Sequence, residues 1–184
     1  MIFYETRIKG VYVLEAERFE DERGFFSPSF SQREFAAHGL ASSYVEHNLS
    51  FNLRRGTLRG LHYQAPPYAE VKLVRCTART AFDVVVDIRL DSPTFKEWLG
   101  VELSAKNRKM LYIPEGFAHG FQTLEDHTEL FYQMSKAYVP NAARGIRWDD
   151  PDLHITWPLQ VTALSTSDAA FPTLSSLLHS GQPL

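Results

Sequence analysis

The feature that most constrains the fold is a run of strict alternation in the middle of the chain. Between residues 82 and 90, apolar side chains occupy every second position, namely Phe82, Val84, Val86, Ile88 and Leu90. The positions between them include Asp83, Asp87 and Arg89. This two-residue period predicts a half-buried β-strand that ends at the turn formed by residues 91–93. Such a strand requires neighbouring strands to pair with.

Further segments with the composition of short strands follow one another, separated by polar or glycine-containing breaks. They cover residues 72–76, 98–104, 109–114, 118–124 and 128–134. Helix signals are scarce: Ser31 and Glu34 form a capping box with Gly39 placed to end the helix, and a second short helix is expected at 173–178. We therefore predict an all-β fold, a sandwich or jelly-roll barrel with short peripheral helices. Without repeats or linkers, residues 1–184 are expected to form a single domain.

Composition narrows the class of partner. The chain is 44% hydrophobic and has a formal net charge of −3 at pH 7. This balance argues against nucleic acid and against an anionic membrane, because both partners require clustered positive charge. No apolar run approaches the length needed to cross a bilayer, and the N-terminal segment MIFYETRIKG lacks a signal-peptide apolar region. One cysteine, Cys76, permits no internal disulfide, so a cytoplasmic protein is expected.

One face of the predicted strand 72–76 carries an unexpected charge. Alternation places Lys72 on the same face as Val74 and Cys76, two residue types that are usually buried. A lysine that points into an interior loses its hydration, which makes it a candidate for a functional role. The alternative is that its stem covers apolar surface while the ammonium reaches water.

His62 lies in the segment before this strand. On a regular strand it shares a face with Leu58, Gly60 and Gln64, whereas Arg59 points to the other face. His62 and Arg59 can line one pocket only if Gly60 marks a bulge or an irregular turn. Because a lone histidine is more often structural than catalytic, the residues alone leave both interpretations open.

The segment PEGFAHGF, residues 114–121, has the pattern Pro-x-Gly-x-x-His. It resembles the second conserved motif of cupins, which are small jelly-roll barrels. Metal-binding cupins supply His-x-His and a Glu from their first motif, but here that motif is His62-Tyr63-Gln64 and Glu70 lies beyond the usual spacing. Two imidazoles without a carboxylate make a poor metal site, so we expect the barrel without a metal.

Eight stretches along the chain resemble, in order, those of dTDP-4-dehydrorhamnose 3,5-epimerases. They are DERGFF (21–26), TLRGLHYQ (57–64), KLVRC (72–76), FDVVVDIR (82–89), SPTF (92–95), IPEGFAHGF (113–121), WDDP (148–151) and ITWP (155–158). Eight short matches in sequence are far more specific than any one of them. The resemblance implies a cupin-type jelly-roll homodimer that acts on a nucleotide-diphosphate sugar without a metal or cofactor. The family inverts carbons beside the ketone of a nucleotide-linked 4-keto-6-deoxyhexose.

The resemblance also implies a catalytic set. His62 matches the family's base and Asp168 its partner carboxylate, while Lys72 would offset the negative charge of an enolate oxygen. Tyr132 matches the acid that returns a proton from the opposite face. Without the resemblance, Asp168 would be interpreted as a helix cap or turn residue, and Tyr132 as a core aromatic.

Other matching positions imply contacts with the substrate. Arg23, Arg59 and His119 match residues that meet the diphosphate, where guanidinium groups bind strongly. Tyr138 matches a residue that stacks on the nucleotide base. Asn48 corresponds to the asparagine of a Gln-x-Asn element in which Glu46 replaces the glutamine.

Some positions depart from the family pattern. Pro28 and Ala143 stand where related enzymes have Glu, Ser167 stands where they have Lys, and Arg79 replaces a Gly. The resemblance implies that the first three positions contact the nucleotide, so we expect weak discrimination between nucleotides, or a natural donor linked to CDP, UDP or GDP rather than to dTDP. A monoepimerase, a ketoisomerase of the same barrel and a non-catalytic sugar-nucleotide-binding cupin remain as alternatives.

Overall fold

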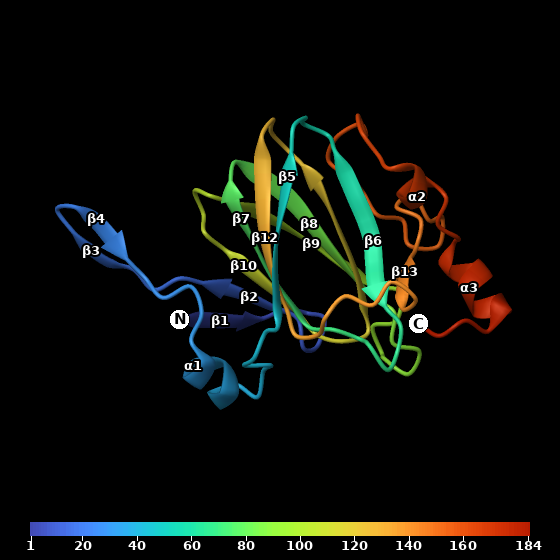
Figure 1. Cartoon of the computed structure of the whole chain (residues 1–184), viewed down its shortest axis with the longest axis horizontal. Helices are drawn as coiled ribbons and strands as arrows, with labels where there is room; N and C mark the ends of the chain where they lie inside the picture. The colour runs from blue at the N-terminus through green and yellow to red at the C-terminus, as the bar shows by residue number, and fades with distance from the viewer.

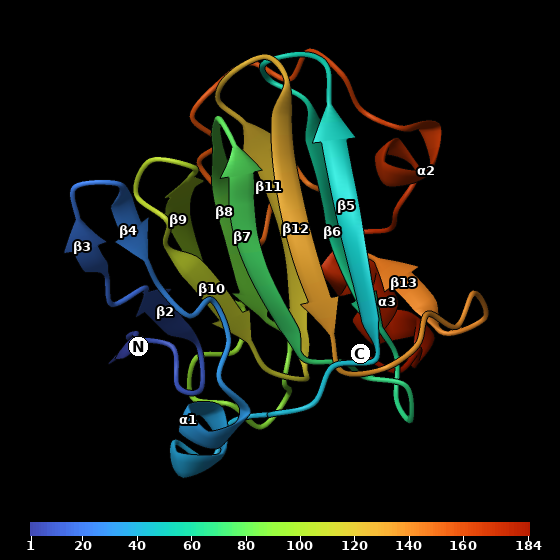
Figure 2. The same ribbon diagram turned by 60° about the vertical axis from the view of Figure 1, so that its left-hand side comes forward.

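Two antiparallel sheets face each other and make up most of the molecule, as Figures 1 and 2 show for the computed structural model of residues 1–184. One sheet has the strand order β1-β2-β10-β7-β12-β5 and the other β13-β6-β11-β8-β9. The strands are β1 (Ile2–Glu5), β2 (Tyr12–Glu15), β3 (Phe19–Asp21), β4 (Gly24–Phe26), β5 (Glu46–Asn52), β6 (Leu58–Gln64), β7 (Lys72–Ala78), β8 (Thr80–Asp87), β9 (Trp98–Ser104), β10 (Met110–Ile113), β11 (Phe117–Thr123), β12 (Thr128–Met134) and β13 (Ala143–Gly145). The helices are α1 (Gln32–Ala37), α2 (Thr166–Ala169) and α3 (Leu174–Ser180). The predicted all-β jelly roll with short peripheral helices is confirmed.

The two predicted helices form where their caps indicated. Ser31 caps α1 by accepting a hydrogen bond from the Glu34 amide at 3.4 Å, and Gly39 follows the helix with a φ of 69°. The Glu34 carboxylate binds the N-terminal ammonium of Met1 at 2.6 Å. Thr173 caps α3 in the same way.

The expectation that the strand around residues 82–90 is half-buried is wrong. Asp83 and Asp87 on β8 are fully buried, as are Val84 and Val86 on the opposite face. One face of β8 points into the space between the sheets, where Val85 joins the main apolar cluster. Its other face is covered by a second apolar layer that includes α3. A two-residue period identifies a strand, but it cannot show that both faces are covered, the face of Asp83 and Asp87 by the opposite sheet and the face of Val84 and Val86 by a second layer.

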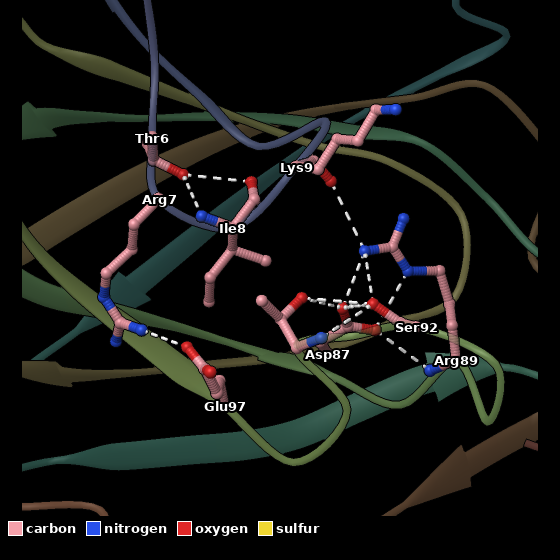
Figure 3. Close-up of polar contacts among 9 residues, drawn as sticks. Thr6, Arg7, Ile8, Lys9, Asp87, Arg89, Ser92 and Glu97 are labelled. Atoms are coloured by element: carbon pink, nitrogen blue, oxygen red, sulfur yellow. Dashed lines mark hydrogen bonds and ion pairs between the residues drawn. The ribbon is translucent and has the colours of Figure 1, made fainter.

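A polar network holds the loop after β8 against the N-terminal segment (Figure 3). The buried Asp87 carboxylate accepts hydrogen bonds of 2.6 Å each from Arg89 Nη2, Ser92 Oγ and Thr94 Oγ1. Burial pushes the pKa of Asp87 up, but these hydrogen bonds hold it below its ordinary value. Arg89 also donates to the Lys9 carbonyl at 3.3 Å, so the network joins segments far apart in the chain.

A separate hairpin, β3 and β4, projects away from the barrel at the left of Figure 1. It forms a two-stranded sheet of its own, and its two strands pair only with each other. Phe19 and Phe26 on this hairpin are 59% and 72% exposed. None of the helices is long and apolar enough to cross a membrane.

Candidate active site

A histidine–carboxylate pair lies at the wall of the barrel. His62 on β6 is 2.8 Å from Asp168, measured from Nε2 to Oδ1. Asp168 lies on α2, where Ser165 accepts a hydrogen bond from its amide, and its Oδ2 accepts from the Gly60 amide at 3.3 Å. Burial pushes the pKa of Asp168 up, but the hydrogen bonds from His62 and Gly60 hold it below its ordinary value. The carboxylate is therefore ionised at neutral pH.

This pairing determines the tautomer of His62. An ionised carboxylate can only accept, so Nε2 carries the proton and donates it to Asp168. The other ring nitrogen, Nδ1, then holds a lone pair. The His62 side chain is 44% exposed and lines the cavity next to Asp168, whose side chain is only 6% exposed. The Asp168 carboxylate is therefore buried, whereas the His62 imidazole that it binds is accessible from the cavity.

A bulge in β6 brings His62 and Arg59 to the same cavity. The sequence predicts that both residues can line one pocket only if Gly60 marks such a bulge. The pairing of β6 with β11 shifts register between His119 and Phe121, opposite Gly60. Gly60 has a φ of 125°, and a Cβ there would lie 2.6 Å from Gly120 Cα. Only glycine fits this close approach. Arg59 is fixed by a 2.8 Å hydrogen bond from its Nε to Asn52 Oδ1.

Tyr132 on β12 belongs to the sheet that faces β6 (Figure 2). It lines a cavity of about 260 Å³ together with Asn48, Arg59, His62, Lys72 and His119. Burial raises the pKa of Tyr132 well above its ordinary range, and the charge of Asp83 adds to this effect. Tyr132 therefore keeps its proton at neutral pH. An acid and a base from facing sheets thus share one cavity.

Lys72 points inward, as the alternation of its strand indicated. Its side chain is 8% exposed, and its Nζ is 3.3 Å from Glu70 Oε1. The same ammonium donates to the His62 carbonyl oxygen at 3.4 Å. The interpretation in which the lysine reaches water is therefore wrong, because the ammonium ends in a buried ion pair.

His119 forms a second histidine–carboxylate pair deeper in the barrel. Its Nε2 is 2.9 and 3.0 Å from the two oxygens of Asp83, and the side chains are 5% and 0% exposed. The His119 ring meets the Tyr132 ring edge-on with centroids 5.9 Å apart. No group of three or more His, Cys, Asp or Glu side chains is placed to hold a metal ion.

A neighbouring cavity of about 410 Å³ extends from His62 and Asp168 to Tyr138. Tyr138 is 62% exposed, and its amide donates to Glu46 at 3.1 Å. Ala143 and Ser167, two of the departures from the family pattern, line this cavity. Pro28 lies elsewhere, in a small pocket at the base of the hairpin.

Arg23 is the one expected site residue that a single chain does not bring to these cavities. It lies at the turn of the β3–β4 hairpin, its side chain is 84% exposed, and it pairs with Asp21. The hairpin carries it away from the barrel (Figure 1).

Sequence reasoning missed several residues of the site. Arg144 and Phe171 line the cavity of Tyr138, and Glu70 pairs with Lys72. The alternating pattern places Asp83 on a strand and gives no sign that its carboxylate binds His119. The one available signal was chemical: a buried cation such as Lys72 requires an anion nearby, and Glu70 is the nearest in sequence.

The chain is similar to known proteins of one family. The family model described as dTDP-4-dehydrorhamnose 3,5-epimerase matches residues 5–176. The dTDP-4-dehydrorhamnose 3,5-epimerase of Shigella flexneri is 49% identical over 165 residues, which cover 89% of this chain and 91% of the relative.

Two solved structures are also similar. The dTDP-6-deoxy-D-glucose-3,5-epimerase of Legionella pneumophila, in complex with dTDP-4-keto-L-rhamnose, is 39% identical with a TM-score of 0.91, covering 99% of this chain and 97% of that one. A 3′-monoepimerase from Streptomyces bikiniensis, in complex with dTDP-quinovose, is 32% identical with a TM-score of 0.90, covering 98% and 91%. This cupin jelly roll therefore belongs to the dTDP-4-dehydrorhamnose 3,5-epimerase family and is an epimerase.

Proposed function

We propose that this enzyme inverts C3 and C5 of a dTDP-linked 4-keto-6-deoxyhexose, converting dTDP-4-dehydro-6-deoxyglucose to dTDP-4-dehydrorhamnose. The observation that carries the proposal is that His62, which is paired with Asp168, lines one cavity with a protonated Tyr132 on the facing sheet. Inversion requires a proton to leave from one side of a carbon and another to arrive from the opposite side. A base and an acid on facing walls meet that requirement.

In the first step His62 Nδ1 removes the proton from a carbon beside the C4 ketone. The electrons of the broken C–H bond form a carbon–carbon double bond to C4, and the π electrons of the C4 carbonyl move to its oxygen, which becomes an enolate oxygen. Asp168 stabilises the imidazolium that forms, because it is ionised and 2.8 Å away. The Lys72 ammonium offsets the charge on the enolate oxygen.

In the second step Tyr132 delivers its proton to the opposite face of the same carbon. The enolate electrons form the new C–H bond and the ketone returns. Solvent then restores the proton of Tyr132 and removes the one held by His62. A second round at the other carbon beside the ketone completes the double inversion.

Binding residues hold the nucleotide while the sugar reacts. Arg59 and His119 contact the diphosphate, His119 through Nδ1, the ring nitrogen that Asp83 does not use. Asn48 lies opposite Tyr132 on β5 and contacts the substrate. Tyr138 stacks on the base, because its ring is exposed at the edge of the neighbouring cavity.

We propose a homodimer in which the partner subunit's Arg23 completes the site. The β3–β4 hairpin carries Arg23 away from its own barrel and exposes Phe19 and Phe26, which a second copy would cover. The cytoplasm is the compartment we propose, because the single cysteine is a free, buried thiol.

The test is incubation with dTDP-4-dehydro-6-deoxyglucose in deuterated water, followed by NMR of the sugar. The proposal predicts deuterium at both C3 and C5 and inverted configuration at both carbons. Exchange and inversion at one carbon only would instead support the monoepimerase, the activity of the similar Streptomyces bikiniensis protein. A non-catalytic binder would show neither change.

A further inference from the structure

Glu70 is a buried carboxylate that the mechanism above does not use. Its side chain is 7% exposed, and its Oε1 lies 3.3 Å from Lys72 Nζ. It borders the cavity that also contains His62 and Asp168. A carboxylate this deeply buried is costly to the fold unless its charge is compensated, and Lys72 supplies that compensation.

Glu70 is itself held rigidly from the other side. Its Oε2 accepts a hydrogen bond of 2.9 Å from Gln64 Nε2. The Gln64 amide is anchored in turn, because its Nε2 also donates to the Tyr68 carbonyl at 3.1 Å and its Oε1 accepts from the Val139 amide at 2.7 Å. The chain Gln64–Glu70–Lys72 therefore connects the body of β6 to the reacting end of the lysine.

We infer that Glu70 is a positioning residue that fixes the Lys72 ammonium for the reaction, an inference that rests on the proposed function. Lysine has three N–H donors on a flexible stem. Glu70 takes one donor and the His62 carbonyl takes a second, which leaves one for the cavity shared with His62 and Tyr132. Without Glu70, the ammonium keeps one anchor and loses its fixed direction.

The charge of Glu70 has a second, opposite effect on the substrate. It places a negative charge near a cavity that receives a diphosphate, and this charge repels the ligand. Removal of the charge therefore lowers the rate of the chemical step but does not weaken binding. If Glu70 only supported the fold, its removal would lower the rate of the chemical step and weaken ligand binding together.

The experiment is a double-mutant cycle that measures kcat with dTDP-4-dehydro-6-deoxyglucose as the substrate. The Kd for dTDP is measured on the same variants by titration. Glu70→Gln keeps the shape of the side chain, and we expect kcat to fall roughly ten-fold while the Kd for dTDP does not rise. In a Lys72→Met background the same Glu70→Gln change should alter kcat by less than about two-fold, because its effect passes through the lysine. Glu70→Asp, which keeps the charge but withdraws it by about one methylene, should also lower kcat.

Glu115→Gln is the matched control. Glu115 is exposed on the wall of an adjacent cavity that Glu70 and Lys72 also line, so the variant removes the same charge without touching Lys72. We expect it to leave kcat unchanged. Equal losses from Glu70→Gln in the wild-type and Lys72→Met backgrounds, or a loss of dTDP binding that parallels the loss of kcat, would overturn the inference. Failure of the wild-type enzyme to exchange deuterium would instead overturn the proposed function.

Discussion

The Asp168→Asn substitution tests the histidine–carboxylate pair without changing its shape. The asparagine oxygen can still accept from the Gly60 amide, as Asp168 Oδ2 does at 3.3 Å. The side chain would then present an NH₂ group to His62 Nε2, where the carboxylate oxygen accepted at 2.8 Å. An NH₂ donor there favours the tautomer with the proton on Nδ1, which removes the lone pair from the nitrogen that acts as the base in the proposed mechanism.

The expected size of the effect follows from the distance and the burial. Two charges about 4 Å apart interact by about 4 kcal/mol at an effective dielectric constant of about 20. Since the His62 side chain is 44% exposed, solvent screens the imidazolium and reduces this to about 2–3 kcal/mol. We therefore expect kcat for deuterium exchange to fall roughly 30- to 150-fold.

The assay is NMR detection of deuterium incorporation under saturating substrate, with the Kd for dTDP measured in parallel. Asp150→Asn is the matched control, because Asp150 is as buried as Asp168. Its carboxylate accepts hydrogen bonds from the amides of Leu174 and Asp152 and none from His62. It should lower the melting temperature and leave kcat intact. An Asp168→Asn enzyme that binds dTDP normally and exchanges within three-fold of the wild-type rate would refute the role of the pair.

Three further predictions concern the acid and the nucleotide. Tyr132→Phe should keep part of the deuterium exchange but lose inversion, since His62 still removes the proton and no group delivers one to the opposite face. Equal loss of exchange and inversion would contradict the role assigned to Tyr132. Because burial raises the pKa of Tyr132 well above the ordinary value of a tyrosine, its acid form persists as pH rises, and the ratio of inversion to exchange should stay constant from pH 7 to pH 10. A decline of this ratio with a midpoint below pH 10 would count against a buried acid. Pro28, Ala143 and Ser167 stand where the resemblance to the family implies nucleotide-contacting residues, so kcat/KM should differ by less than roughly a hundred-fold among dTDP-, UDP-, CDP- and GDP-linked substrates. A thousand-fold preference for dTDP would show that other residues recognise thymine.

Much of the fold could be predicted because its signals are local. The period of residues 82–90 identified β8, and the caps at Ser31 and Thr173 identified α1 and α3. The parity of the strand 72–76 also predicted that Lys72 shares a face with Val74 and Cys76, since alternation depends only on the backbone, but it left open whether the ammonium reaches water.

The remaining features depend on contacts between distant segments. Asp83 and Asp87 are buried because their face of β8 points into the space between the two sheets, and a second layer covers the opposite face, neither of which a two-residue period can show. Asp168 reaches His62 only because α2 packs beside β6. The two residues are 106 positions apart in the sequence, so no local pattern indicates that they pair. The resemblance to a known family supplied that pairing, whereas the Glu70–Lys72 ion pair required the structure.

The central claim is that His62 is the base that removes the proton beside the ketone, and the His62→Ala variant tests it most directly. The measurement is the rate of solvent deuterium incorporation into the substrate sugar, with the Kd for dTDP determined on the same protein. We expect incorporation to fall by ~10²–10⁴-fold or more while dTDP still binds. Near-normal incorporation by a folded His62→Ala enzyme would contradict the claim, because another group would then be removing the proton.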